Sequence, residues 1–161
     1  MRITELNIYP LKSGRVVPLS ESNVTAWGLP GDRHAMLVDP NGQFITQREL
    51  PKIAQITVKA NGAGFHLSID RQDEVLALPS GNRIEATVWK TPVDAAVASD
   101  EANATLSGWL GQEVKLVFFD EQSRRVASTE WTGTETPVAF ADGYQILVTT
   151  TASLAALNAN M

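Results

Sequence analysis

The chain has 161 residues, of which 43% are hydrophobic and 19% are charged, and its formal net charge at pH 7 is −5. It contains no cysteine, which excludes disulfides, cysteine-ligated zinc or iron–sulfur sites and a cysteine nucleophile within this sequence. The length suits one domain with a real core, and the acidic balance argues against a nucleic-acid partner.

Membrane and export signals are also missing from the sequence. No stretch approaches the roughly 20 apolar residues that a membrane span needs. The charged N-terminus has no long apolar run behind it, unlike a signal peptide. With the lack of cysteines, this favours a cytoplasmic protein that has no membrane partner.

Two N-terminal loops place basic side chains beside turn-forming residues. A predicted strand, Ile3–Tyr9, runs into Pro10, which cannot continue it because proline lacks an N–H. Lys12 and Ser13 follow at the strand end, and residues 28–34 form a second loop that carries Arg33. Between the loops, residues 16–24 read as a strand broken by a proline. If the two loops lie side by side, they form a pocket for an anion.

A hairpin is expected next, from His34 to Thr46. Residues 34–38 are apolar, residues 39–42 are a strong turn signal centred on Asn41-Gly42, and residues 44–46 return as strand. Since the two ends of a hairpin are neighbours in space, Arg48 is expected close to Arg33.

Two further hairpins are predicted, and together they suggest the fold class. One joins residues 53–60 and 65–70 through a turn at 61–64, and the other joins 75–78 and 84–89 through a turn at 79–82. Many short antiparallel strands at even spacing favour a mainly β fold, either a closed or nearly closed barrel or a sandwich, and we expect the barrel-like form. One or two short helices make the chain α+β overall.

The last third begins with a helix. Asp100 is a plausible N-cap, residues 104–110 have helical spacing, and Gly111 is a plausible C-terminal cap. A strand at 114–119, a long loop at 120–137, a short strand at 146–148 and a helix capped by Thr151 are expected to follow. A final helix of about 10 residues is marginal alone. We therefore interpret the chain as part of a longer protein, the alternative being that a short docked helix is its natural end.

Few residues offer catalytic chemistry. His34 and His66 are the only histidines, no serine–histidine–aspartate pattern is readable, and there is no dinucleotide or P-loop motif. His66 is expected on the solvent face of a strand, whereas His34 could approach a pocket. Asp32 is interpreted as a turn residue or an ion-pair partner of Arg33, and the four tryptophans as core or rim residues.

The remaining signal is phosphate-type recognition by a cluster of four residues. Lys12 supplies a point charge, Ser13 a hydroxyl, and Arg33 and Arg48 planar forks. The alternative is that these are ordinary solvated surface charges, because most exposed cations do nothing specific.

Several short motifs, in this order and spacing, resemble a known family. They are Tyr9-Pro10-Leu11-Lys12-Ser13, Gly28-Leu29, Asp32-Arg33, Thr46-Gln47-Arg48, and residues 140–144 with 151–158. This set resembles the N-terminal β-barrel domain of MOSC-domain proteins, which include YcbX-like bacterial proteins and mitochondrial amidoxime-reducing components. The resemblance implies a barrel domain at 1–139 and the truncated start of a MOSC domain at 140–161.

The resemblance also implies a function. It points to a molybdenum-cofactor oxidoreductase that reduces N-hydroxylated compounds, with electrons from a ferredoxin-like domain or a separate reductase. Lys12, Ser13 and Arg33 would hold the phosphate end of the cofactor, and Arg48 and Thr150 (or Thr149) extend this set. No catalytic residue or metal ligand is assigned, because the metal-ligating cysteine of the family belongs to the C-terminal MOSC domain. The chain alone is therefore expected to be inactive and to hold no cofactor tightly.

Two other interpretations stay open at this stage. One is a non-catalytic barrel that binds a small anion, for example pyridoxal phosphate on Lys12, or that docks another domain. A single-stranded nucleic-acid-binding barrel is a more distant one, since the charge has the wrong sign and no aromatic run supports it.

Overall fold

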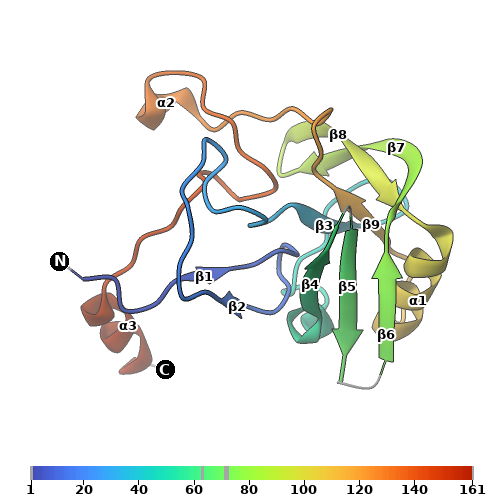
Figure 1. The fold of residues 1–161 in the computed structure, drawn as a ribbon, viewed down its shortest axis with the longest axis horizontal. Coiled ribbons are helices and arrows are strands. Elements are labelled where there is room, and N and C mark those ends of the chain that lie inside the picture. Colours follow the sequence, from blue (N-terminus) through green and yellow to red (C-terminus); the bar gives the residue numbers. More distant parts are fainter. Residues whose placement is uncertain (1, 63, 71–72, 161) are drawn as a thin grey trace.

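The computed structural model describes residues 2–62, 64–70 and 73–160, and in them short antiparallel strands dominate (Figure 1). The strands are β1 (Asn7–Ile8), β2 (Val17–Pro18), β3 (Ala35–Val38), β4 (Thr57–Asn61), β5 (Gly64–Ile69), β6 (Asp73–Ala77), β7 (Pro79–Val88), β8 (Thr91–Ala98) and β9 (Lys115–Phe118). The helices are α1 (Asp100–Leu110), α2 (Thr129–Thr132), α3 (Thr151–Asn158) and the 3-10 helix η1 (Pro51–Gln55). The mainly β, α+β prediction is confirmed, and α2 is a helix that the sequence did not predict.

The strands form three antiparallel sheets that further hydrogen bonds connect into a barrel-like arrangement. Their orders are β1-β2, β3-β9-β8-β7 and β4-β5-β6. The Lys12 N–H donates to the Ala35 carbonyl (2.8 Å), and the Arg15 N–H donates to the Ile56 carbonyl (3.0 Å). The loop after β1 therefore lies between β3 and the start of β4, two elements of different sheets.

The four-stranded sheet separates two apolar clusters, one on each of its faces. One cluster fills the space between the sheets and beneath α1, and includes Leu37, Leu67, Leu106 and Leu116. The other covers the opposite face and includes Met36, Val38, Val117 and Phe140. Strand β3, buried at all four positions, contributes alternate residues to each cluster, as the pleat requires.

Helix α1 follows its sequence signals closely. Gly111 adopts a left-handed conformation (φ 76°) at its C-terminal end, as predicted. The N-cap is Ser99, whose side chain accepts a hydrogen bond from the Ala102 N–H, and Asp100 is instead the first helical residue. The prediction was one residue out, because serine and aspartate are both good caps.

Several predictions about the strands were wrong, mainly about which strands pair with one another. Strand β6 pairs with β5, and β7 pairs with β8, which the sequence did not predict, so the hairpin of 75–78 with 84–89 does not form. Residues 79–82, expected as a turn, begin β7. Residues 53–55 lie in η1, and residues 146–148 form no strand. The predicted 61–64 turn includes Ala63, which lies outside the described residues.

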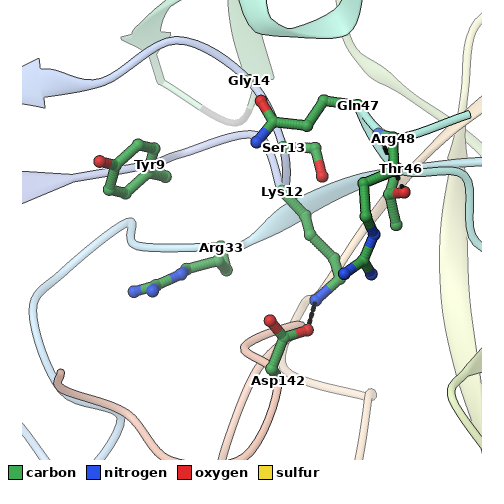
Figure 2. Close-up of a pocket in the computed structure, with 9 residues that line it drawn as sticks. All are labelled: Tyr9, Lys12, Ser13, Gly14, Arg33, Thr46, Gln47, Arg48 and Asp142. Atoms are coloured by element: carbon green, nitrogen blue, oxygen red, sulfur yellow. Dashed lines mark hydrogen bonds and ion pairs between the residues drawn. The ribbon is translucent and has the colours of Figure 1, made fainter. Parts of the chain in front are cut away.

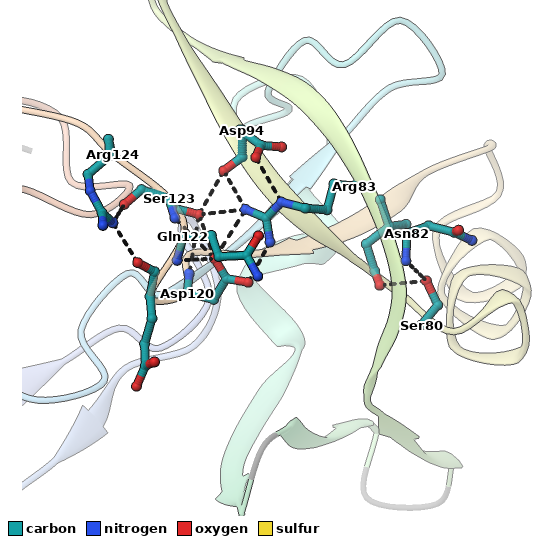
Figure 3. Close-up of polar contacts among 10 residues, drawn as sticks. Ser80, Asn82, Arg83, Asp94, Asp120, Gln122, Ser123 and Arg124 are labelled. Atoms are coloured by element: carbon teal, nitrogen blue, oxygen red, sulfur yellow. Dashed lines mark hydrogen bonds and ion pairs between the residues drawn. The ribbon is translucent and has the colours of Figure 1, made fainter.

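A dense polar network ties β7 to β8 and to the segment after β9 (Figure 3). The Arg83 guanidinium donates to carboxylate oxygens of Asp94 (2.8 Å) and Asp120 (2.6 Å). Ser123, which is fully buried, donates to the Asp94 carbonyl at 2.7 Å. This Arg83 network fixes where the chain turns back after the sheet.

The C-terminal segment lies apart from the sheets. Figure 1 shows α3 and α1 at opposite sides of the molecule. No residue of α3 is buried, and Leu147 and Val148 just before it are 78% and 77% exposed. None of the helices in the described residues is long and apolar enough to span a bilayer.

Candidate functional site

The first site loop is a tight turn that ends with Lys12, Ser13 and Gly14. The Gly14 N–H donates to the Leu11 carbonyl at 2.9 Å, and a Cβ on Gly14 would come within 2.9 Å of the Leu11 Cβ. Ser13 has a positive φ of 65°, a region that non-glycine residues rarely occupy. Such conformations cost about 1–3 kcal/mol and cluster at functional sites.

The second site loop lies against the first and carries a similar backbone feature. Arg33 has a φ of 51°, and its N–H donates to the Tyr9 carbonyl at 2.8 Å. The buried carboxylate of Asp32 accepts a hydrogen bond from the Tyr9 N–H (2.7 Å) and forms an ion pair with Arg33. The prediction that Asp32 is a turn and ion-pair residue is confirmed, and so is the expectation that the two loops adjoin.

A third loop completes a pocket of about 330 Å³ between these segments (Figure 2). Thr46, which is buried, accepts at its carbonyl from the Leu50 N–H (2.9 Å), so residues 46–50 make a helical turn that presents Gln47 and Arg48. The lining residues are Tyr9, Lys12, Ser13, Gly14, Arg33, Thr46, Gln47, Arg48 and Asp142. Three cations and one carboxylate thus line the same pocket, to which Arg33 and Arg48 both contribute, although Figure 2 shows the Arg33 guanidinium directed away from Lys12 and Arg48.

Lys12 is the most buried cation of the pocket, at 6% exposed. Its ammonium donates to the Phe140 carbonyl (2.8 Å) and to Asp142 Oδ1 (2.5 Å), and lies 5.5 Å from the centre of the Phe44 ring. Burial lowers the pKa of Lys12, although the Asp142 carboxylate acts in the opposite direction.

A second buried cation holds the segment that carries Asp142. Arg125 donates through Nη1 to the carbonyls of Ala139 (2.7 Å) and Ala141 (2.5 Å), and through Nη2 to that of Asp142 (3.2 Å). Lys12 donates a hydrogen bond to the carbonyl of Phe140, whose side chain is fully buried. Residues 139–142 are therefore fixed by two cations through four consecutive backbone carbonyls.

Two lining residues, Arg48 and Asp142, are contacted by Trp89, which does not itself line the pocket. The Arg48 guanidinium lies 5.8 Å from the ring centre of Trp89, which is half exposed and has a φ of 57°. The Trp89 Nε1–H donates to Asp142 Oδ1 at 3.1 Å, and its ring meets Phe44 edge to face at 5.1 Å. Although burial acts to raise it, the pKa of Asp142 is lowered by the hydrogen bonds and charge of Lys12.

Four of the five residues selected from the sequence meet in this pocket, namely Lys12, Ser13, Arg33 and Arg48. Thr150 does not line it. Its side chain caps α3 by accepting from the Ser153 N–H at 3.0 Å. His34 does not line it either and stacks on Phe119, while His66 is exposed in β5, as expected.

No site role was predicted for Arg125 or for Asp142, although Asp142 lies in the stretch 140–144 that carries part of the family resemblance. Both lie more than 100 residues beyond Lys12, in segments with no clear period. A lone arginine and a lone aspartate carry no spacing signal, so only the three-dimensional contacts identify them.

The chemistry of the pocket is that of anion recognition. Fixed cations, a hydroxyl and two strained loops suit a phosphate-like group. No group of three or more metal-ligating side chains occurs among the described residues. Within that part of the chain, the site therefore offers charge and hydrogen bonds and lacks a metal-ligand set.

Comparison with known proteins gives one family match and several relatives. The model of the MOSC N-terminal beta barrel domain matches residues 1–113. Mitochondrial amidoxime-reducing component 1 of Xenopus laevis and of Homo sapiens are each 27% identical over 99% of this chain, covering 50% and 51% of those proteins. Human mitochondrial amidoxime reducing component 2 is 28% identical over 99% of the chain. The chain thus spans about half the length of the curated relatives it matches.

A solved structure is also similar in part. The solution structure of a protein from Bordetella bronchiseptica covers 66% of this chain and 92% of its own, with a TM-score of 0.49 and 13% sequence identity.

Proposed function

The chain belongs to the MOSC N-terminal beta barrel domain family, and we propose that it forms the cofactor-holding half of a molybdenum-cofactor oxidoreductase that reduces N-hydroxylated compounds. The resemblance noted in the sequence is thereby confirmed at the level of the family. The relatives are amidoxime-reducing components by name, which supports the oxidoreductase family. The substrate class and the cofactor remain proposals for this chain.

One observation carries the proposal: the pocket is lined by Lys12 and Ser13 from one loop, by Arg33 from a second and by Arg48 from a third. Arg33 and Arg48 offer planar N–H forks that suit phosphate oxygens, and Lys12 adds a fixed positive charge. We assign these four residues to the phosphate end of a molybdopterin. Thr150 remains a prediction, because it caps α3 and does not line the pocket.

The donor set fits one end of such a cofactor and leaves the metal end to another part of the protein. When bound, a molybdenum cofactor supplies the two-electron chemistry that removes oxygen from an N-hydroxylated nitrogen. This chain has no cysteine, so a thiolate ligand would come from outside it. We therefore expect the 161-residue chain alone to have no reductase activity.

The proposed partners follow from this division. A MOSC domain would continue from residues 140–161, a segment whose apolar side chains at positions 147, 148, 154 and 157 are more than half exposed. A ferredoxin-like domain or a separate reductase would supply electrons. A cytoplasmic location stays a prediction, whereas the relatives named above are mitochondrial.

The test is cofactor retention in the protein that joins this chain to its MOSC domain. Lys12→Met and Arg33→Met should each lower molybdenum and pterin content after gel filtration, by about tenfold at limiting cofactor. The loss of one charge-assisted contact costs about 1.5–3 kcal/mol, which sets this magnitude. Molybdenum is measured by mass spectrometry and pterin by fluorescence after oxidation.

The matched control is Lys59→Met, which removes an exposed cation from β4, away from the pocket. It should leave both contents unchanged. Thermal unfolding of every variant verifies that the barrel is intact. Full molybdenum occupancy in folded Lys12→Met and Arg33→Met protein would remove the assigned role.

The second candidate function is a non-catalytic barrel that binds a small anion. The cations of the pocket suit this function as well as they suit the phosphate end of a cofactor. Its pyridoxal phosphate form requires a free Lys12 amine. The Lys12 ammonium already donates to Phe140 and Asp142 and is almost fully buried, which opposes imine formation there. Borohydride treatment with pyridoxal phosphate should therefore leave the mass of Lys12 peptides unchanged, and a reduced adduct on Lys12 would favour this candidate.

A further inference from the structure

Asp142 is an unexpected residue for a pocket that binds only an anion. Its side chain is 72% exposed at the pocket, and it contacts the Lys12 ammonium at 2.5 Å. A carboxylate in this position repels an incoming phosphate and reduces the attraction of the cations around it. Phosphate binding alone therefore does not explain why Asp142 lines this pocket.

The carboxylate is held in one position by groups from three segments. Oδ1 accepts from Lys12 Nζ (2.5 Å) and from Trp89 Nε1 (3.1 Å), and the Asp142 carbonyl accepts from Arg125 (3.2 Å). Figure 2 shows the Asp142 carboxylate at the edge of the pocket, directed toward the Lys12 side chain. Such a fixed group recognises a ligand at low entropic cost.

The second carboxylate oxygen, Oδ2, accepts no hydrogen bond from any residue that the structure describes. A carboxylate has about four lone-pair sites, of which Lys12 and Trp89 use two on Oδ1. The remaining capacity lies on Oδ2, beside a pocket whose other charged lining residues, Lys12, Arg33 and Arg48, are cations. A ligand that brings both an anion and N–H donors would satisfy both kinds of group.

Trp89 supports this arrangement from outside the lining. Its left-handed backbone, its contact with Phe44 and the Arg48 guanidinium on its ring fix the indole N–H that holds Oδ1. A left-handed backbone at a non-glycine residue such as Trp89 is unfavourable, and it persists only where the surrounding contacts hold it. Trp89 therefore acts as a positioning residue for Asp142.

We propose that Asp142 is a specificity-determining residue, which accepts hydrogen bonds from the N–H edge of a nitrogen heterocycle while Ser13, Arg33 and Arg48 bind the phosphate of the same ligand. This inference rests on the proposed function and adds that Asp142 recognises the N–H edge of the ligand. The structural alternative is that Asp142 is only a counter-ion for Lys12.

The experiment compares two probes on the 161-residue chain by isothermal titration calorimetry. One probe is methyl phosphate, and the other is the phosphate ester of 6-hydroxymethylpterin, which adds ring N–H donors. The wild-type chain should bind the pterin ester at least tenfold more tightly than methyl phosphate. Asp142→Asn should bind methyl phosphate more tightly, because a negative charge is gone, and the pterin ester more weakly, so that the preference falls tenfold or more.

A matched control removes one carboxylate elsewhere. Glu74→Gln neutralises an exposed carboxylate in β6 and should leave both affinities unchanged. Trp89→Phe keeps the Asp142 carboxylate but loses the N–H that positions it. It should lower the preference for the pterin ester over methyl phosphate by several-fold. Thermal unfolding checks that each variant is folded.

The outcomes separate this inference from the proposed function. Equal gains for both probes in Asp142→Asn would identify a plain counter-ion and overturn the inference, and so would wild-type binding of both probes with equal affinity. If the wild-type chain binds neither probe, the inference is overturned, whereas the proposed function is decided separately by molybdenum retention in the protein that joins this chain to its MOSC domain.

Discussion

The Arg83 network and the Lys12 pocket both gather charged side chains, but they use their hydrogen-bonding groups in opposite ways. Arg83 donates to two carboxylates, to the Asp94 carbonyl (3.0 Å) and to Ser123 (3.5 Å). The Arg48 guanidinium lies over the Trp89 ring, and no hydrogen bond from it to another described residue is present. The N–H donors of Arg83 are used by other groups of the protein, whereas those of Arg48 are available to a ligand.

This difference separates structural charges from binding charges. An arginine whose N–H groups are all taken fixes the fold and has little left to offer a ligand. An arginine held by an aromatic face keeps its position and its free donors. Arg33 lies between the two cases, because it pairs with Asp32 and also lies 5.6 Å from the Tyr9 ring centre. The three predictions below test this distinction.

Arg125→Met should have the largest effect on stability. The change leaves the buried carbonyls of Ala139 and Ala141 and that of Asp142 without donors, which should lower the free energy of unfolding by about 3 kcal/mol. Urea denaturation followed by fluorescence measures this. Arg124→Met is the matched control, because Arg124 is exposed, and it should cost less than about 1 kcal/mol. A loss below about 1 kcal/mol for Arg125→Met would show that these carbonyls find other donors.

Arg83→Met and Arg48→Met should have opposite consequences. Arg83→Met breaks the Asp94 and Asp120 contacts and should cost about 2 kcal/mol of unfolding free energy, with no change in methyl phosphate affinity. Arg48→Met should change stability by no more than about 0.5 kcal/mol but weaken methyl phosphate binding about tenfold. Denaturant titration and calorimetry on the same samples measure both quantities. If both variants lose stability and keep their affinity, the two clusters do not differ in the way we describe.

Local signals in the sequence were sufficient for some elements. Apolar runs and caps located β3, α1 and β9, and the positions of proline, glycine and basic residues located the loops with Lys12 and Arg33. Each of these features depends on neighbouring residues, which a single sequence displays directly.

Strand pairing and contacts between residues far apart in the sequence could not be predicted from such local signals. Pro79-Ser80-Gly81-Asn82 reads as a turn, yet β7 continues across it through an irregularity in register: Pro79 pairs with Ala98 of β8, and pairing resumes only at Arg83 with Ala96. Asp142 reaches the pocket only because Arg125 and Lys12 hold its segment. The motif at residues 140–144 contains Asp142 but does not indicate which distant residues it contacts.

The smallest expected effect concerns acid stability, and it contrasts Asp120 with Asp142. A hydrogen bond from Arg83, above all, lowers the pKa of Asp120 in the folded state below its ordinary value of 3.8. The Asp120 carboxylate therefore stabilises the fold fully above that unfolded-state value, and this contribution is lost as the pH falls through the folded-state pKa. Asp142 also has a lowered pKa, but burial opposes the shift and its side chain is 72% exposed, so its contribution should be smaller. Urea denaturation between about pH 5 and pH 2 should show a flatter loss of stability for Asp120→Asn than for Asp142→Asn. Equal slopes for the two variants would mean that the pocket carboxylate is as strongly engaged by the protein as the network carboxylate, and would remove the basis for reserving Asp142 for a ligand.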